Sequence, residues 1–446
     1  MFQLAFILIG AKAFRGKWYI VAGLGVALIL LGLFVAFGPP SHALLIAHAL
    51  LGTLFLSNGI LVALGGATAQ DRSPLRAFLK SGGLVLMGGL VLIAAFWTPV
   101  ALAVALGLAL AVDGAFRITS TLVILFPGWR VVMLIGGIEI LAAPMVALGW
   151  PLSYETAILL ATGLMLALFG RFLLEFGLSF RTLPPEFSIL NLPYFAGRGW
   201  YAHAPILVGD DDPEDQNRPP LTVYVWTPAG VATDPERTLL MDRYLAAVDK
   251  DGSYSTGHSA LEVKPDLYIS HYPSEELAIP ENMNKLSSLQ SLADTTQKGE
   301  FHDSYEGDVD WWCAADVRLE FPRYSYRRLL AFWLGYSQDS TYHLTNRNCS
   351  VVAAAGLDAA LEGVLAGKRP WLRLLSLLLD PDLWGAVLAR NRATAMTWTP
   401  GLFHDYARAL GRVLQPTKMP WITRLKWFVY RARLSARTFG RKGKHA

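Results

Sequence analysis

Apolar residues form long runs in the first part of the chain, and polar and charged residues are concentrated after residue 181. A helix needs roughly 20 mostly apolar residues to cross about 30 Å of hydrocarbon. The pattern predicts an all-α bundle of six membrane-spanning helices over residues 1–181, and the third, which is short, should begin a turn before its apolar run. The six runs are Trp18–Phe37, Ala43–Gly65, Gly83–Trp97, Val100–Ile118, Val131–Leu148 and Thr156–Leu174.

Proline marks the end of every second apolar run. The first, third and fifth runs finish at "GPP", "WTP" and "GWP", which places Pro39, Pro99 and Pro151 at tight turns that lead directly into the next run. Because the arrangement is repeated, it predicts three helical hairpins.

The positions of lysine and arginine predict the orientation of these spans, because short basic loops remain on the cytoplasmic side. Basic residues lie before the first run, after the second, after the fourth and after the sixth, whereas the three proline turns carry none. We therefore expect both termini and the region after residue 181 in the cytoplasm, with the spans in a bacterial-type inner membrane. The opening "MFQLAFILIG" lacks the features of a signal peptide and is expected at the membrane interface.

The three hairpins, together with the "VDGAFRI" stretch Val112–Ile118, resemble the HdeD-type acid-resistance membrane proteins. The resemblance covers about residues 10 to 180, and it implies a fold and a stress-related context. No chemistry can be carried over from it.

Asp113, Arg117 and Glu139 are charged residues inside the predicted spans, where charge is costly. Asp113 and Arg117 are four residues apart on one helix face and can pair. Glu139 has no partner in its own helix, so an interhelical hydrogen bond is expected, with His48 as one candidate partner. A proton-sensing or transport site is the alternative interpretation.

The polar second half predicts a separate α+β domain. Residues 182–220 are expected to be a linker, because Gly209–Pro220 reads "GDDDPEDQNRPP". The domain itself should cover residues 221–410. Strand-like sequence occurs at 221–226, 258–263, 267–272 and 313–321, and helical sequence at 235–248, at 325–336 after Ser325, and from Asn348 onward.

Cys349 is the most informative residue of this domain. Asn348 is a good N-cap, which places Cys349 in the first turn of a helix. A thiolate there is stabilised by the helix dipole and by free backbone N–H groups, so its pKa is expected to fall. The same N–H groups could hold the oxyanion of an acyl intermediate. The other cysteine, Cys313, lies in strand-like sequence and is interpreted as a core residue.

His258 and His271 lie on two successive predicted strands joined by a short turn, so an antiparallel pair could place them side by side. One imidazole could accept the cysteine proton while the other orients it. Glu262 is a weaker orienting candidate, because it is four strand residues from His258, about 13 Å at the usual rise.

The segments "GHSALEVKPDLYISHYP" and "NRNCS" resemble the circularly permuted papain-like fold of the NlpC and lecithin retinol acyltransferase superfamily. The resemblance covers about residues 221–365. It implies that Cys349 is the nucleophile, His258 the general base and His271 the orienting residue. The chain departs from the family in a long polar insertion near residues 281–310, and it lacks the acidic and aromatic residues that follow the cysteine in the acyltransferase branch.

The C-terminal segment is strongly basic. Residues 411–446 carry ten lysines and arginines and no acidic residue, interleaved with aromatic side chains, and are expected to lie on an anionic membrane surface. A nucleic-acid-binding tail is the competing interpretation, but the net charge of +4 gives it no support. Residues 371–379, "WLRLLSLLL", are too short to span and should form a core helix.

Two further counts limit the chemistry. Two cysteines argue against a disulfide framework, and no phosphate-binding glycine loop or Cys/His cluster occurs, so neither cofactor nor metal is expected. The sequence thus predicts a membrane-anchored cytosolic cysteine hydrolase, peptidase or acyltransferase that acts on a lipid-linked or peptide substrate. The alternative is a non-enzymatic, stress-related membrane scaffold or permeation protein with a regulatory or binding soluble domain.

Overall fold

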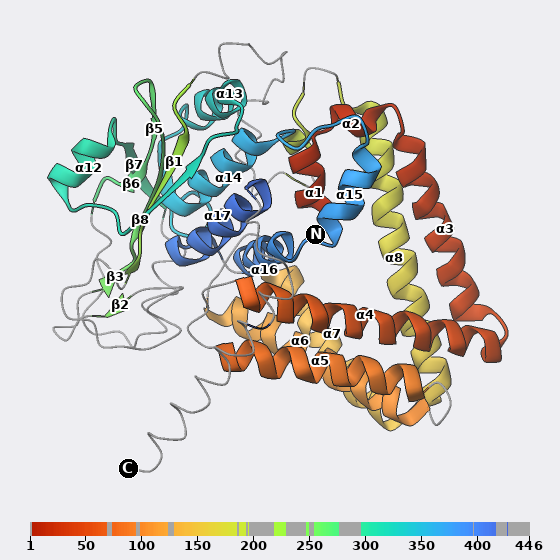
Figure 1. Ribbon diagram of the computed structural model, residues 1–446. Helices are drawn as coiled ribbons and strands as arrows, with labels where there is room; N and C mark the ends of the chain where they lie inside the picture. Colours follow the sequence, from red (N-terminus) through yellow and green to blue (C-terminus); the bar gives the residue numbers. More distant parts are fainter. Residues whose placement is uncertain are drawn as a thin grey trace. The chain divides into compact units, whose positions relative to one another are not determined.

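The computed structural model describes residues 2–68, 74–94, 99–123, 129–184, 187–192, 195, 218–228, 247–248, 254–275, 296–395, 397–415 and 426. The chain divides into two compact units (Figure 1). The helical unit comprises residues 15–119, 130–182 and 417–446, and the α+β unit comprises residues 1–14, 120–129 and 183–416. The chain therefore passes between the two units more than once.

Each of the six apolar runs forms a helix over its described residues. Among the described residues, five helices are long and apolar enough to cross a membrane, which indicates a membrane protein. The remaining helix, α5, has a shorter apolar stretch at Ser81–Ile93, and it begins at Pro74, further before the apolar run than the single turn expected. The helices are α3 (Trp18–Phe37), α4 (Pro40–Thr68), α5 (Pro74–Ala94), α6 (Pro99–Val123), α7 (Trp129–Leu148) and α8 (Tyr154–Thr182).

Glycines spaced seven residues apart bring these helices together in pairs. A Cβ atom on Gly25 of α3 would lie 2.5 Å from the backbone nitrogen of Leu174 in α8, and one on Gly163 would lie 2.5 Å from the carbonyl oxygen of Gly32. Only glycine allows such backbone approach, the usual way in which membrane helices associate. The same contacts join α4 to α5 and α6 to α7, through Gly52, Gly59, Gly88, Gly107, Gly114 and Gly136. These pairs differ from the hairpins that the proline turns predicted.

The charged residues of the spans are paired. Arg117 donates to Asp113 in its own helix, at 2.8 Å, and to Glu139 of α7, at 3.1 Å. His48 instead bonds the carbonyl oxygen of Leu44 in its own helix, at 2.8 Å. The partner of Glu139 is therefore Arg117, which supports the structural interpretation of this carboxylate.

The core of the α+β unit is a four-stranded antiparallel sheet in the order β5-β4-β1-β8. These strands lie in the four segments that the sequence predicted as strands, and a turn at residues 264–266 joins β4 to β5. The fourth begins four residues later than expected, so Cys313 precedes it. Their bounds are β1 (Leu221–Trp226), β4 (His258–Val263), β5 (Leu267–Ile269) and β8 (Val317–Phe321).

The predicted strand at residues 267–272 is interrupted at Ser270. Its second part, β6 (His271–Pro273), leaves the main sheet and joins β7 (Thr296–Phe301) and β9 (Thr341–His343) in a three-stranded sheet. The polar insertion therefore supplies a strand. A small ribbon pairs β2 (Ala247–Val248) with β3 (Tyr254–Ser255), and the rest of the predicted helix at 235–248 lies outside the described residues.

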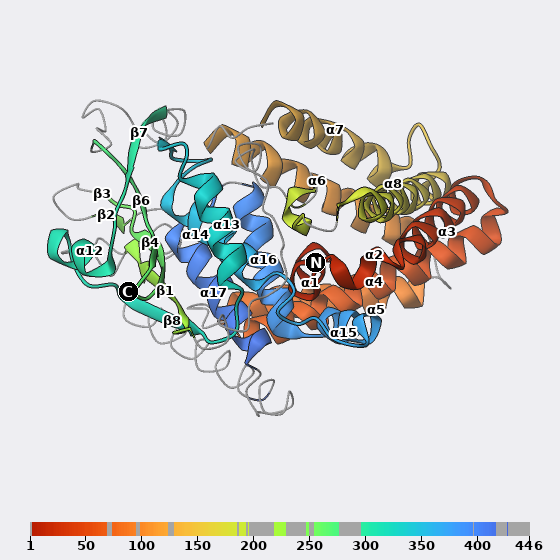
Figure 2. The same ribbon diagram turned by 90° about the horizontal axis from the view of Figure 1, so that it is seen from above.

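Helices cover both faces of the main sheet (Figure 2). Helix α14 (Cys349–Leu361) packs on one face, where Gly356 approaches the Leu261 side chain, and α12 (Tyr305–Trp311) lies on the other, where Tyr305 stacks on Tyr224 with ring centroids 3.9 Å apart. The remaining helices are α13 (Tyr326–Tyr336), α15 (Pro370–Leu378), α16 (Pro381–Ala395) and α17 (Pro400–Leu414).

The opening segment belongs to this unit, contrary to the expectation of a membrane-interface position and a boundary at residue 181. Helix α1 (Phe2–Ile9) is buried against α14, α15 and α16, and α2 (Lys12–Arg15) follows it. Its last carbonyls accept hydrogen bonds from Gly363 and Leu365, at 2.9 and 2.8 Å. The core of the α+β unit removes the apolar side chains of α1 from water, and the basic residues Lys12 and Arg15 follow in α2.

The linker and the tail are described only in part. The short helix η1 (Ile189–Asn191) is held by Glu362, which accepts from Ser188 and from the backbone of Ile189. Residues 196–217 lie outside the described residues. The predicted tail begins inside α17, and of the residues after 414 only Gln415 and Lys426 are described.

Candidate functional site

Cys349 occupies the first position of α14, as the N-cap predicts. The Asn348 side chain accepts a hydrogen bond from the Val351 N–H at 2.8 Å, and its amide nitrogen donates to the carbonyl oxygens of Leu344 and Trp398, at 2.6 and 3.0 Å. These bonds fix the start of the helix. The thiol is 7% exposed and lies 3.8 Å from the hydroxyl of Ser350.

The expected fall in the pKa of Cys349 does not occur. Burial raises the pKa to about 11, although the Ser350 hydroxyl and the backbone N–H groups of Ser259, Ser350 and Cys349 act in the opposite direction. Desolvation of the thiolate outweighs these donors. The sulfur is therefore a neutral thiol at neutral pH, surrounded by N–H groups that would stabilise negative charge.

His258 lies on the opposite face of β4 from α14. Successive strand residues point to opposite faces. Ser259 points to α14, where its hydroxyl lies 3.1 Å from that of Ser350, so His258 points away. Its ring stacks on Tyr272, with centroids 3.8 Å apart, and contacts Trp226. Burial lowers the pKa of His258 well below its usual value, so this imidazole is neutral.

A chain of hydrogen bonds fixes the tautomer of His258. Its Nε2 atom lies 2.8 Å from the Ser270 hydroxyl, which donates to Asp308 at 3.2 Å. A carboxylate is acceptor-only, so the serine proton faces Asp308 and the serine oxygen must accept from the imidazole. His258 therefore carries its proton on Nε2, and Nδ1 has the free lone pair of a base.

Asp308 is the last acceptor in this series of hydrogen bonds. It is fully buried in the first turn of α12, where the helix dipole favours a carboxylate. The Tyr268 hydroxyl donates to it at 2.5 Å, and Nδ1 of His302 donates to its other oxygen. Three donors thus fix the carboxylate behind Ser270 and His258.

His271 does not meet His258 through a hydrogen bond. Its Nδ1 atom lies 3.0 Å from the Tyr336 hydroxyl and its Nε2 atom 3.2 Å from the carbonyl oxygen of Ser340. Burial lowers the pKa of His271 to about 4. The orienting contact expected of His271 is made by Ser270, its neighbour in the chain.

Tyr272 is close to both the thiol and the imidazole. It stacks on His258, and a charge on Cys349 would raise the pKa of its hydroxyl further. Among the described residues, this buried hydroxyl has no hydrogen-bond partner. The structure contains no hydrogen bond between the Cys349 sulfur and either predicted histidine, because each of the three has the other partners given above.

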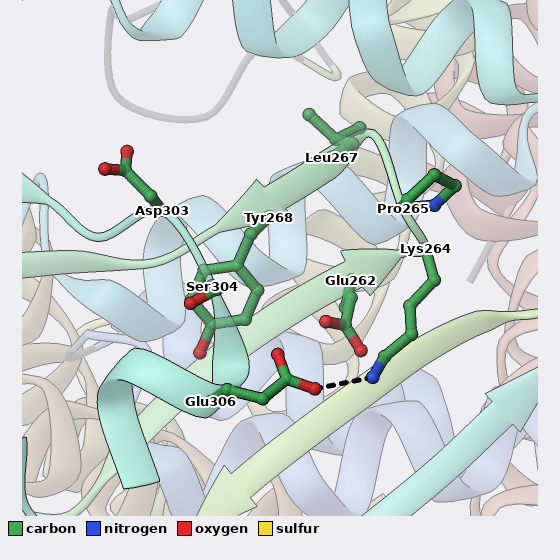
Figure 3. Close-up of a pocket in the computed structure, with 8 residues that line it drawn as sticks. All are labelled: Glu262, Lys264, Pro265, Leu267, Tyr268, Asp303, Ser304 and Glu306. Carbon is green, nitrogen blue, oxygen red and sulfur yellow. Dashed lines mark hydrogen bonds and ion pairs between the residues drawn. The ribbon is translucent and has the colours of Figure 1, made fainter. Parts of the chain in front are cut away.

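A cleft of about 250 Å³ opens beside the Asp308 network (Figure 3). Tyr268 and Glu262 line it, and Lys264 forms an ion pair with Glu306 at 2.7 Å on its rim. Glu262 accepts from Tyr224 at 2.8 Å and does not contact His258, so its weaker candidacy as orienting residue gains no support. Neither Cys349 nor His258 lines this cleft.

The other cysteine has a structural partner. Cys313 is partly buried, and its carbonyl oxygen accepts from the Trp226 indole at 2.8 Å. Among the described residues, no group of His, Cys, Asp and Glu is arranged to hold a metal ion.

The chain was compared with protein-family models, with curated proteins and with solved structures, and none of the three comparisons found a match. The function is therefore inferred from the side chains themselves.

Three residues of the network, Ser270, Asp308 and His302, were not among the predicted site residues. Ser270 has a local signal, because it precedes His271 in a strand that can pair with the strand of His258. Asp308 and His302 lie in or beside the polar insertion, where neither period nor motif marks them, and only their contacts reveal them.

Proposed function

We propose that the α+β unit is a cysteine hydrolase or acyltransferase in which Cys349 is the nucleophile and His258 the general base. The observation that carries this proposal is the tautomer of His258. Its Nε2–H is bound to Ser270 and Asp308, which leaves a basic Nδ1 on the strand residue next to Ser259, whose N–H lowers the pKa of the Cys349 thiol. A base oriented by a third group beside a nucleophile is the usual signature of covalent catalysis.

The proposed reaction has two halves. The Cys349 sulfur attacks the carbonyl carbon of an ester, thioester or amide while its proton passes to Nδ1 of His258. The leaving alcohol, thiol or amine takes that proton, and an acyl-enzyme remains. Water, or another hydroxyl, thiol or amine acceptor, then gives a proton to His258 and attacks the acyl group, which releases the acid or the transferred product and restores the thiol.

Charge on the intermediate would be stabilised by groups already present. The N–H groups of Cys349 and Ser350 lie at the helix N-terminus, and the buried Tyr272 hydroxyl is available to donate. Because His258 and α14 lie on opposite faces of β4, proton transfer requires a rearrangement on substrate binding that brings the Cys349 sulfur and Nδ1 of His258 within hydrogen-bond reach.

The order of His258, Ser270 and Cys349 along the chain supports a relation to the permuted papain-like superfamily, with Ser270 in the orienting position that His271 was expected to fill. The membrane-spanning unit favours a lipid-linked substrate, and a peptide substrate fits the same chemistry. The proposed reaction needs no cofactor with either substrate.

For the helical unit, we propose that all six helices α3–α8 span an inner membrane and that both termini and the α+β unit are cytoplasmic. The basic loops support this orientation. Ser41→Cys and Ser153→Cys, beside two of the proline turns, should react with a membrane-impermeant maleimide from outside the cell. Labelling of either position only after lysis would refute the orientation.

Intact mass spectrometry with p-nitrophenyl acyl esters tests the enzymatic proposal on the full chain in detergent. A single acyl adduct is expected at Cys349, absent in Cys349→Ala and retained in the matched Cys313→Ser variant. Acylation of Cys313 alone, or of neither cysteine, would contradict the proposal and favour the non-enzymatic alternative.

A further inference from the structure

Helix α15 presents apolar side chains on two opposite sides. Leu374 and Leu377 are buried in the α+β unit, whereas Leu372 and Leu375 are each 57% exposed and Leu379, directly after the helix, is 77% exposed. The exposed leucines recur at spacings of three and four, so they form one continuous stripe. A stripe of this kind on a water-facing surface is unfavourable unless something covers it.

Exposed cations border this stripe. Lys368 and Arg369 precede the helix and Arg373 lies within it, and all three are exposed. A leucine stripe with a basic border is typical of helices that lie in the plane of a membrane interface. Basic residues near an anionic lipid surface strengthen such binding.

Helix α15 contacts a residue that lies just before the first long apolar helix in the chain. The Trp371 ring of α15 packs on Phe14, with centroids 5.1 Å apart, and Trp18 begins the first span four residues later. Four residues extend over at most about 14 Å. The chain between Phe14, which α15 contacts, and the first long apolar helix is therefore short.

The second connection ends at the same part of the α+β unit. The last span, α8, ends at Thr182, and Ser188 is bound to Glu362 at the end of α14. The neighbouring Gly363 and Leu365 donate to the carbonyl oxygens of α1. The segments that precede α3 and follow α8 are therefore both fastened to the part of the α+β unit that contains α1, the end of α14 and α15.

We propose that the exposed face of α15, formed by Leu372, Leu375 and Leu379, inserts into the interface of an anionic lipid bilayer. The inserted face orients the α+β unit against the membrane that its own chain spans. This inference is independent of the chemistry at Cys349.

Fluorescence quenching in vesicles tests the proposal. The full chain, with Cys313→Ser and Cys349→Ser, carries one cysteine at Leu375→Cys or, as the matched control, at Asp310→Cys on α12, which lies at the opposite end of the α+β unit (Figures 1 and 2). Each variant is labelled with bimane and reconstituted in phosphatidylglycerol and phosphatidylcholine. Nitroxide-bearing lipids should quench position 375 several-fold more than position 310, and aqueous iodide should show the reverse order.

Charge reversal gives a second readout that a folding defect would not imitate. Arg369→Glu with Arg373→Glu should reduce lipid quenching at position 375 and leave position 310 unchanged. Equal iodide quenching at both positions would overturn the proposal. Protection of position 375 from both quenchers would also overturn it, because protein, either the helical unit or a second copy of the chain, would then cover the stripe.

Discussion

On one face of the strand pair β1–β4, the buried Cys349 thiol lies 3.8 Å from the Ser350 hydroxyl, whereas on the other face His258 is linked through Ser270 to a buried carboxylate. Burial raises the pKa of the thiol and lowers that of the imidazole, so both groups are neutral. The difference lies in orientation: hydrogen bonds hold the base in one tautomer, while only weak donors surround the sulfur. The nucleophile is therefore activated by a proton acceptor during the reaction and does not exist as a resting thiolate.

The largest expected effect comes from removing the base. His258→Ala should lower the rate of acylation of Cys349 at pH 7 by about 10²-fold to 10⁴-fold, the usual contribution of a positioned general base. Stopped-flow release of p-nitrophenol measures this rate. Alkylation of the same variant by iodoacetamide at pH 10 should stay within a few-fold of the parent, because hydroxide then removes the proton.

Loss of the orienting chain should have a smaller effect. Asp308→Asn should lower acylation by roughly 10-fold to 10²-fold, because a misplaced base loses the aligned geometry. Ser270→Ala should give a similar loss, and the double variant should lose no more than the larger single effect, since both residues act through His258. If the two single losses in acylation rate multiplied in the double variant, Ser270 and Asp308 would not act through His258 together.

The pH dependence of folding stability tests whether His271 is shielded from water. His271 has its pKa lowered from 6.5 to about 4 by burial, so the unfolded chain binds a proton that the folded chain rejects. Its contribution to stability is present above pH 6.5 and is lost as the pH falls from 6.5 to 4, by about 3 kcal/mol. Thermal unfolding of the α+β unit in the full chain at pH 7 and pH 4.5 measures this, and His271→Gln should reduce the pH dependence. An unchanged pH dependence in that variant would show that His271 is hydrated.

Packing of α14 on the sheet should show the smallest effect. Gly356 approaches Leu261 and Phe332 so closely that a Cβ atom would lie 2.9 and 3.2 Å from them. Gly356→Val should destabilise the fold by about 1–3 kcal/mol through overpacking. Ala355→Val, on the less buried side of the same helix, is the matched control, and equal losses for the two variants would exclude this packing contact as the cause.

Much of the fold could be predicted because its signals are local. The spans follow from apolar length, and the caps Ser325 and Asn348 mark the starts of α13 and α14. The strands at 221–226 and 258–263 follow from alternation and from β-branched and aromatic residues. Helix α1 could not be placed from its sequence, because an apolar segment of this length suits a core and an interface equally.

The site was predicted less completely, for a topological reason. The chain changes from one sheet to another at Ser270, so this residue and His271 have different neighbours. The alternation of apolar and polar residues does not indicate this change. The pKa of Cys349 was expected to fall because the helix N-terminus is visible in the sequence, whereas the opposing desolvation depends on packing by distant segments. Asp308 is an acidic residue in a polar insertion, and only the folded chain shows that it is fully buried.

The pH dependence of alkylation at Cys349 tests the neutral-thiol account most directly. In the full-length Cys313→Ser variant, the rate of reaction with iodoacetamide should rise about tenfold per pH unit from pH 7 to pH 10, because the thiolate is the reacting species and the pKa is about 11. A rate that levels off near pH 7 would mean that the thiolate is already formed at rest, and it would contradict the account.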